Sequence, residues 1–169
     1  MTDAQPHIAA VTLDERSVLR RNAEIEQERA TAIADLVRAN RFVLASGRAG
    51  PFHLHLAASE GRLTIDVRDA GGASIETITL PLQPFRGIVR DYFLICESYY
   101  KAVRGANLGQ VEAIDMGRRG LHDEAAELLI ERLADRVAID HDTARRLFTL
   151  ICVLHLKTSA HGLGPHRRS

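Results

Sequence analysis

With 169 residues, the chain has the length of one domain and can bury a core without reinforcement by disulfides or metal ions. Apolar residues make up 46% of the chain and charged residues 26%, which is ordinary globular usage. The 22 basic residues balance the 22 acidic ones, so the composition argues against a nucleic-acid-binding protein, whose affinity depends on excess positive charge.

The cysteines and the apolar segments narrow the class of protein further. Cys96 and Cys152 lie far apart in apolar helical patterns, which is typical of buried reduced thiols rather than of a zinc or redox site. The first residues, MTDAQPHIAA, lack the basic start and apolar core of a secretory signal. The apolar block at residues 147–156 is much shorter than the roughly 20 residues that span a membrane. We therefore expect a soluble cytoplasmic protein without a membrane partner.

The N-terminal part of the chain combines a strand pattern with a helical one. Residues 7–13 (HIAAVTL) alternate apolar side chains on one side, which indicates a strand. Residues 14–40 are polar with an apolar helical stripe, so the pattern predicts a helix that begins between positions 14 and 22 and ends at Asn40.

Three consecutive segments then show the two-residue period of β-strands, namely residues 52–58, 63–69 and 74–80. A turn at Glu60 and Gly61 pairs Leu56 with Ile65, so the apolar faces of the first two strands coincide. The segments therefore predict an antiparallel meander with one apolar and one polar face.

A turn at residues 71–72 (GG) pairs Ile65 with Ile78 and adds the third strand to the meander. In this register Ile75 falls on the polar face. We therefore predict a β-bulge near Glu76.

Residues 84–104 carry the longest helical pattern of the chain. Pro84 suits the first helical turn, where its missing N–H has no partner to lose, and Gly105 can end the helix. The apolar residues recur at steps of three and four and form one stripe. We predict that this helix covers the apolar face of the sheet.

The last part of the chain is helical. Residues 106–116 read as a short helix or an irregular connector, and residues 121–137 as an amphipathic helix. A final helix, capped by Asp140 or Asp142, extends to about Lys157.

Together these patterns predict an α+β fold. We expect an antiparallel β-meander of three to five strands packed on a long central helix, with a helical C-terminal half. Residues 1–157 form the single domain, and residues 158–169 read as a disordered tail.

Within residues 147–156 only Thr149 and His155 are polar. A helix that is apolar all round lies at the centre of a core or forms half of a subunit interface. This pattern predicts a homo-oligomer assembled through the 147–156 helix, unless the helix is internal to the chain. His155 reads as a hydrogen-bonded histidine of the core or interface.

The sequence GRRGLHDE, residues 117–124, is the main candidate site. Arginine forks and the N–H groups of a helix start at this point favour an anion, so Arg118, Arg119 and His122 are predicted to bind one. Alternatively, the segment is a tight loop in which the arginines pair with nearby acids: Glu112, Asp115 or Asp123.

His53 and His55 share one face of a predicted strand, and the register places Asp66 opposite His55. Two imidazoles and a carboxylate are a possible divalent-metal set. However, Arg68 opposite His53 opposes a cation, and the polar face reads as the solvent side of the sheet. We therefore predict no metal site.

Residues 140–142 place a histidine between two aspartates. Acids beside a histidine can support proton transfer, but at these positions we interpret them as a helix cap.

The segments DYFLICESYYKAV, IDMGRRGLHDEAAELL and IDHDTARRLFTLICVLHLK, within residues 7–157, resemble an uncharacterised bacterial protein family of about this length. The resemblance implies no activity, cofactor or catalytic residue.

Two function hypotheses follow. The first is a non-catalytic cytoplasmic binding or regulatory protein, oligomeric, whose partner is a small anionic ligand or an acidic protein. The second is an enzyme for a small phosphorylated or carboxylate substrate, with the charge held by Arg118 and Arg119 and protons moved by His122 or Asp115. The sequence specifies no cofactor.

Overall fold

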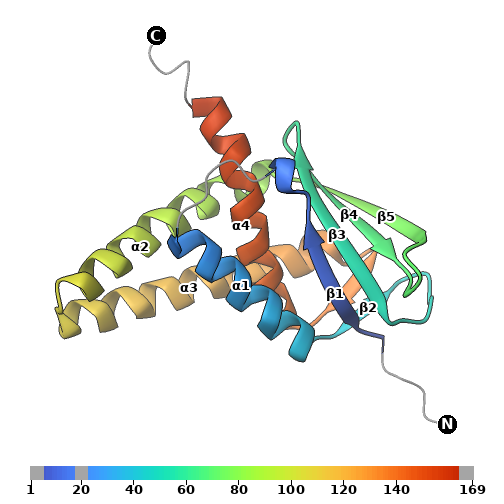
Figure 1. Ribbon diagram of the computed structural model, residues 1–169, viewed down its shortest axis with the longest axis horizontal. Helices are drawn as coiled ribbons and strands as arrows, with labels where there is room; N and C mark the ends of the chain where they lie inside the picture. The colour runs from blue at the N-terminus through green and yellow to red at the C-terminus, as the bar shows by residue number, and fades with distance from the viewer. Residues whose placement is uncertain (1–5, 18–22, 164–169) are drawn as a thin grey trace.

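The computed structural model describes residues 6–17 and 23–163, with side chains as far as Leu154 in the last helix. The α-helices are α1 (Ala23–Arg38), α2 (Arg86–Arg104), α3 (Leu108–Leu133) and α4 (His141–Leu163). The strands are β1 (Ile8–Leu13), β2 (Phe42–Leu44), β3 (Phe52–Ser59), β4 (Arg62–Arg68), β5 (Ser74–Pro81) and β6 (Val137–Ile139). Single 3-10 turns occur at η1 (Glu15–Ser17) and η2 (Gln83–Phe85). The α+β class is confirmed (Figure 1).

The main sheet has the strand order β1-β3-β4-β5. Strands β3, β4 and β5 form the predicted antiparallel meander, whereas β1 runs parallel to β3 and makes the sheet mixed. A parallel neighbour requires a crossover connection, and α1 lies in the connection between β1 and β3. The strand predicted at residues 7–13 is confirmed. It forms one edge of the sheet, parallel to β3.

The predicted register is confirmed. Leu56 pairs with Ile65, and Ile65 pairs with Ile78. The ladder shifts where Val67 faces Glu76 and the next residue, Arg68, faces Ser74, so Ile75 is the extra residue of the bulge. Alternate residues of β3 and β4 are buried, which places one apolar face against the helices.

The helix that covers the apolar face is α4, and the prediction that residues 84–104 cover it is wrong. Leu147 and Ile151 of α4, with the C-terminal end of α3, pack against Leu56 and Ile65 of the sheet. Helix α2 packs along α3 instead, and the two form an arm that extends away from the sheet (Figure 1). The physical reason is that residues 147–154 of α4 are apolar except for Thr149 and can lie between two layers, whereas α2 has one apolar stripe.

Helix α3 is continuous from Leu108, so the expected helix start at position 121 is wrong. Asn107 caps the helix by accepting a hydrogen bond from the backbone N–H of Gln110 at 3.1 Å. Gly117 lies inside the helix, where a β-carbon would be 2.9 Å from Cδ1 of Ile95. This glycine therefore permits the close approach of α2 and α3 rather than ending a helix.

The helix expected to reach position 137 ends at Leu133. The next residues form β6, which pairs with β2 through Phe42 and Ile139 and makes a second, two-stranded sheet. Near the start of the fold, Asn40 donates to the carbonyls of Ile8 and Leu36 and thereby ends α1 as predicted.

The last helix begins as predicted, because Asp140 accepts a hydrogen bond from the backbone N–H of Thr143 at 2.9 Å. Residues 147–154 are all buried inside the chain, so their apolar character does not require a subunit interface. Oligomeric assembly stays a prediction, and the apolar character of this helix no longer supports it. The α4 backbone extends to Leu163, and the disordered tail at residues 158–169 stays a prediction. Residues 164–169 and the side chain of His155 lie outside the described part.

In the part of the chain that the structure describes, no helix combines the length and apolar character needed to cross a membrane.

Ile151 provides a test of the α4 position. We expect Ile151→Ala to lower the free energy of unfolding by roughly 2–5 kcal/mol, because the side chain is 1% exposed and packs between α3 and the sheet. Leu108→Ala, at a leucine that is 76% exposed, serves as the control and is expected to change it by about 0.5 kcal/mol or less. Urea unfolding of both variants measures the difference. Equal effects of the two substitutions would contradict the central position of α4.

Candidate functional site

A partly buried polar network lies where α1 meets the arm formed by α2 and α3. Glu28 of α1 accepts hydrogen bonds from the hydroxyls of Tyr92 at 3.0 Å and Tyr100 at 2.6 Å, both on α2. The Nη1 atom of Arg118, on α3, lies 3.6 Å from the same carboxylate. A carboxylate held by donors from two other helices fixes how the helices approach one another.

Both tyrosines of this network are neutral hydrogen-bond donors. Burial, reinforced by the neighbouring negative charge of Glu28, raises the pKa of each hydroxyl well above its ordinary value. The network therefore holds one anion, Glu28, and one cation, Arg118, at neutral pH.

The two arginines predicted to act together have different environments. The guanidinium of Arg118 lies 4.3 Å from the ring centre of Tyr99 and 3.3 Å from Asp115. The Arg119 side chain is 68% exposed and contacts Asp115 at 2.9 Å. Both arginines pair with Asp115 as the alternative expected, but they do so inside a continuous helix and not in a tight loop. Because both lie in the middle of α3, the argument from a helix N-terminus is wrong.

His122 lies one turn after Arg118 on α3, in an aromatic setting. Its ring makes edge contacts with Tyr92 at 5.2 Å and with Phe148 at 5.9 Å between ring centres. Burial, followed by the positive charges of Arg145 and Arg118, lowers the pKa of His122 to about 4. The imidazole is therefore neutral at physiological pH.

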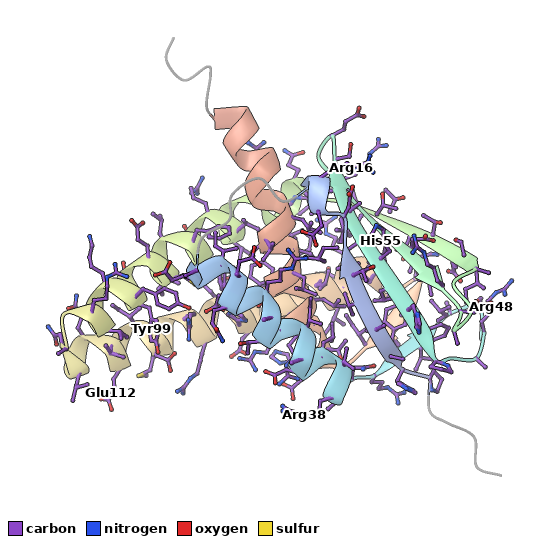
Figure 2. The ribbon with its side chains drawn as sticks, viewed as in Figure 1. Arg16, Arg38, Arg48, His55, Tyr99 and Glu112 are labelled. Carbon is purple, nitrogen blue, oxygen red and sulfur yellow. The ribbon has the colours of Figure 1, made fainter. Side chains whose placement is uncertain are left out.

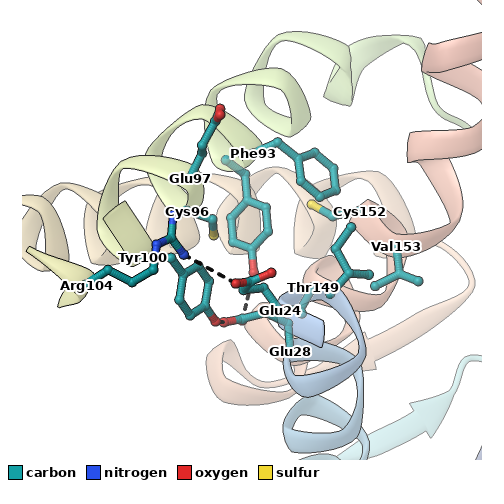
Figure 3. Close-up of a pocket in the computed structure, with 12 residues that line it drawn as sticks. Glu24, Glu28, Phe93, Cys96, Glu97, Tyr100, Arg104, Thr149, Cys152 and Val153 are labelled. Atoms are coloured by element: carbon teal, nitrogen blue, oxygen red, sulfur yellow. Dashed lines mark hydrogen bonds and ion pairs between the residues drawn. The ribbon is translucent and has the colours of Figure 1, made fainter. Parts of the chain in front are cut away.

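Two cavities flank this network. The first, of about 270 Å³, lies between α1, α2 and α4, and Figure 3 shows Phe93, Cys96 and Cys152 around it. The second, of about 160 Å³, lies between α1, α3 and α4 and is lined by polar residues and one alanine: Glu28, Thr31, Ala32, Asp35, His122, Arg145, Arg146 and Thr149. Glu28 and Thr149 line both cavities.

Three buried nitrogen atoms make no hydrogen bond among the described residues: Nη1 of Arg118, Nδ1 of His122 and Nε of Arg145. The two arginine atoms have only longer ion-pair contacts, 3.6 Å from Glu28 for Arg118 and 4.0 Å from Asp123 for Arg145. His122 and Arg145 line the cavity itself, and Arg118 reaches it through Glu28. An arginine N–H is always a donor. The arginine atoms of this cluster are therefore complemented by acceptors, such as the oxygens of a carboxylate or phosphate, and Nδ1 of His122 joins them as a donor in the tautomer that carries its proton there.

The two cysteines are buried free thiols, as predicted. Burial raises the pKa of both Cys96 and Cys152 above the ordinary thiol value. Neutral thiols are poor nucleophiles, so these residues contribute apolar lining to the first cavity.

The histidines of β3 lie apart from this region. His55 is hydrogen-bonded through Nδ1 to the Thr12 hydroxyl at 2.8 Å, and Figure 2 shows it over the sheet, away from Tyr99 on the helical arm. Asp66 accepts hydrogen bonds from Ser74 at 2.6 Å and Arg68 at 2.7 Å. Within the described ranges, no three metal-binding side chains come together.

The sequence analysis named Arg118 and His122 as candidates but did not name Glu28 or Arg145, which the structure places in the same region. Glu28 lies in a helix rich in acidic residues, and Arg145 follows the acids that cap α4. Nothing in either pattern separates these residues from solvated surface charges. Only the packing of α1 and α4 against α3 reveals their roles.

The low pKa of His122 generates a prediction about stability. As the pH falls below 6.5, His122 gains a proton in the unfolded chain, whereas in the folded chain it does so only near pH 4. The folded state therefore loses stability as the pH falls through this window, by about 2 kcal/mol between pH 7 and pH 5. His122→Phe keeps an aromatic ring in place but cannot titrate. Urea unfolding at both pH values is expected to show a smaller loss in the variant, and an equal loss would contradict the assignment.

Comparison with known proteins agrees with the resemblance noted in the sequence. The model of the uncharacterised protein family UPF0262 matches residues 5–157. A UPF0262 protein of Erythrobacter litoralis is 52% identical over 158 residues, which cover 91% of this chain and 99% of the relative. One from Nitrobacter winogradskyi is 54% identical over 158 residues, which cover 94% of this chain and 95% of the relative.

A UPF0262 protein of Rhodopseudomonas palustris is 55% identical over 155 residues, covering 92% of this chain and 95% of the relative. The search of solved structures gave no significant match. The residues matched by the family model, 5–157, include every residue that lines the second cavity. The chain belongs to the uncharacterised protein family UPF0262.

Proposed function

We propose that the protein binds a small anionic ligand, a carboxylate or phosphate compound, in the second cavity. His122 and Arg145 contact the anionic group, and Arg118 adds positive charge beside it. The observation that carries this proposal is the group of buried nitrogen atoms that make no hydrogen bond in the described fold. A buried donor left unpaired costs about 1–3 kcal/mol, which a ligand oxygen recovers on binding.

The charges around the second cavity favour an anion over a cation. Its two carboxylates are already occupied, because Glu28 accepts from two tyrosines and Asp35 lies 3.0 Å from Arg38 and 4.0 Å from Arg146. Arg145 has weaker contacts, 3.6 Å from Asp142 and 4.0 Å from Asp123, and both acids are exposed. The unused capacity of the cavity therefore consists of donors.

The proposal retains Arg118 and His122 from the sequence analysis but not Arg119. The exposed guanidinium of Arg119 lines neither cavity and pairs with Asp115. Arg119 is therefore a matched control on the same helix as Arg118.

Binding without chemistry is favoured by the pKa of His122. A base with a pKa of about 4 accepts protons weakly at neutral pH, where a catalytic base works best with a pKa near 7. One observation favours an enzyme as the second candidate: His122 is held neutral beside two arginines, and a bound anion would raise its pKa toward the useful range. Each anion that the protein binds can be incubated with it and then analysed by mass spectrometry. An enzyme would change the mass of the compound, whereas a binding protein would leave it unaltered.

Arg145→Gln tests the anion site. We expect inorganic phosphate or a small carboxylate such as acetate to raise the melting temperature of the wild type and of Arg119→Gln, because ligands that bind only the folded state stabilise it. In Arg145→Gln the affinity is expected to fall by about tenfold or more, since a charge-assisted hydrogen bond contributes roughly 1.5–3 kcal/mol. Thermal-shift and calorimetric titrations measure both.

Without ligand, Arg145→Gln is expected to remain folded, because the ion pairs of Arg145 are with exposed acids. Calorimetry on His122→Phe provides a second test with a different side chain. Equal affinity in all four proteins, or no binding by the wild type, would contradict the anion site.

A further inference from the structure

We infer that the two cavities form one bipartite site for an amphiphilic anion, a carboxylate or phosphate with an apolar acyl or aryl body. The anionic head occupies the second cavity, so the inference rests on the proposed function for that part. The body occupies the first cavity.

The two cavities share their boundary. Glu28 of α1 and Thr149 of α4 line both, and no other described residue does. The rings on the two sides are also in contact, because Tyr92 lines the first cavity and packs edge-on against His122 of the second. A ligand that reaches past Thr149 therefore contacts both sets of side chains.

The first cavity has the chemistry of a hydrocarbon site. Its interior is formed by apolar and aromatic side chains together with the two neutral thiols: Ile25, Tyr92, Phe93, Cys96, Cys152 and Val153. Its charged residues include Glu97 and Arg104, which are exposed, so they mark the edge open to solvent. Figure 3 shows Arg104 reaching toward Glu24 on one side and Cys152 and Val153 on the other.

The second cavity is polar and the first is largely apolar, and this difference sets the orientation of the ligand. Unpaired donors occur beside the second cavity, and the apolar interior belongs to the first. A head group deep in the first cavity would lose water without gaining donors, since its tyrosine hydroxyls already donate to Glu28 and its arginine, Arg104, lies at the exposed edge beside Glu24. The volumes of about 270 and 160 Å³ together reach the range of small-molecule sites, roughly 300–1,000 Å³.

A series of straight-chain carboxylates tests the bipartite site: acetate, butanoate, hexanoate and octanoate. Calorimetry on the wild type is expected to show affinity rising about fourfold per methylene as the body fills the first cavity. Val153→Phe fills part of the first cavity with an aromatic ring. This variant is expected to lose the increase in affinity with chain length and to bind acetate as the wild type does. Alcohols of the same lengths are expected to bind at least tenfold more weakly, because they lack the charged head.

A measurement on the wild type does not depend on the folding of any variant. Cys96 and Cys152 line the first cavity, so octanoate is expected to slow their alkylation by iodoacetamide several-fold. Acetate, used at a concentration that raises the melting temperature equally, is expected to slow it less. Matching the melting temperatures removes protection that arises only from suppressed global unfolding.

The outcomes separate this inference from the proposed function. Acetate binding that depends on Arg145, without a gain from chain length or extra thiol protection, would overturn the bipartite site and leave the anion site standing. A gain from chain length that is the same for alcohols and for Arg145→Gln would overturn both, because the first cavity would then bind hydrocarbon alone. Chain-length gain that requires Arg145, with thiol protection, supports the bipartite site.

Discussion

The carboxylate of Glu28 constrains the helical half of this protein, because a negative charge removed from bulk water must be met by donors inside the fold. Tyr92 and Tyr100 provide them from α2, and Arg118 adds a positive charge from α3. The same carboxylate lies on the boundary of both cavities. The interaction that fixes α1 against the helical arm therefore also shapes the candidate site.

The position of α4 explains why the candidate site lies among helices and not on the sheet. An all-apolar helix can pack against the sheet on one side and against α1 and α3 on the other, and α4 does both. The sheet then buries one face and leaves the polar one, with His53 and His55, outside. Cavities form where α1, α2 and α3 meet α4 around side chains of unequal size, from Thr149 to Phe93.

Local periodicity was enough to predict the meander, because strand register depends on which residues alternate and where the chain turns. Helix α3 was not predictable in this way. Gly117 resembles a helix terminator in sequence, yet it serves close packing against Ile95, which lies on another helix. Strand β6 depends on pairing with distant β2, and the roles of Glu28 and Arg145 depend on burial by other helices. The sequence thus predicted Arg118 and His122 by residue type, but for the wrong structural reason.

At the proposed site, the charges that set proton binding by His122 are the charges that would hold the anion. Arg145 and Arg118 help to lower the pKa of His122 because they repel a second positive charge nearby. An anion beside the same arginines cancels part of that repulsion and makes protonation of His122 easier. By thermodynamic linkage the effect is reciprocal, so protonation of His122 must strengthen the binding of the anion by the same factor. If the proposed site binds an anion, its affinity is therefore expected to increase as the solution becomes acidic and His122 gains a proton.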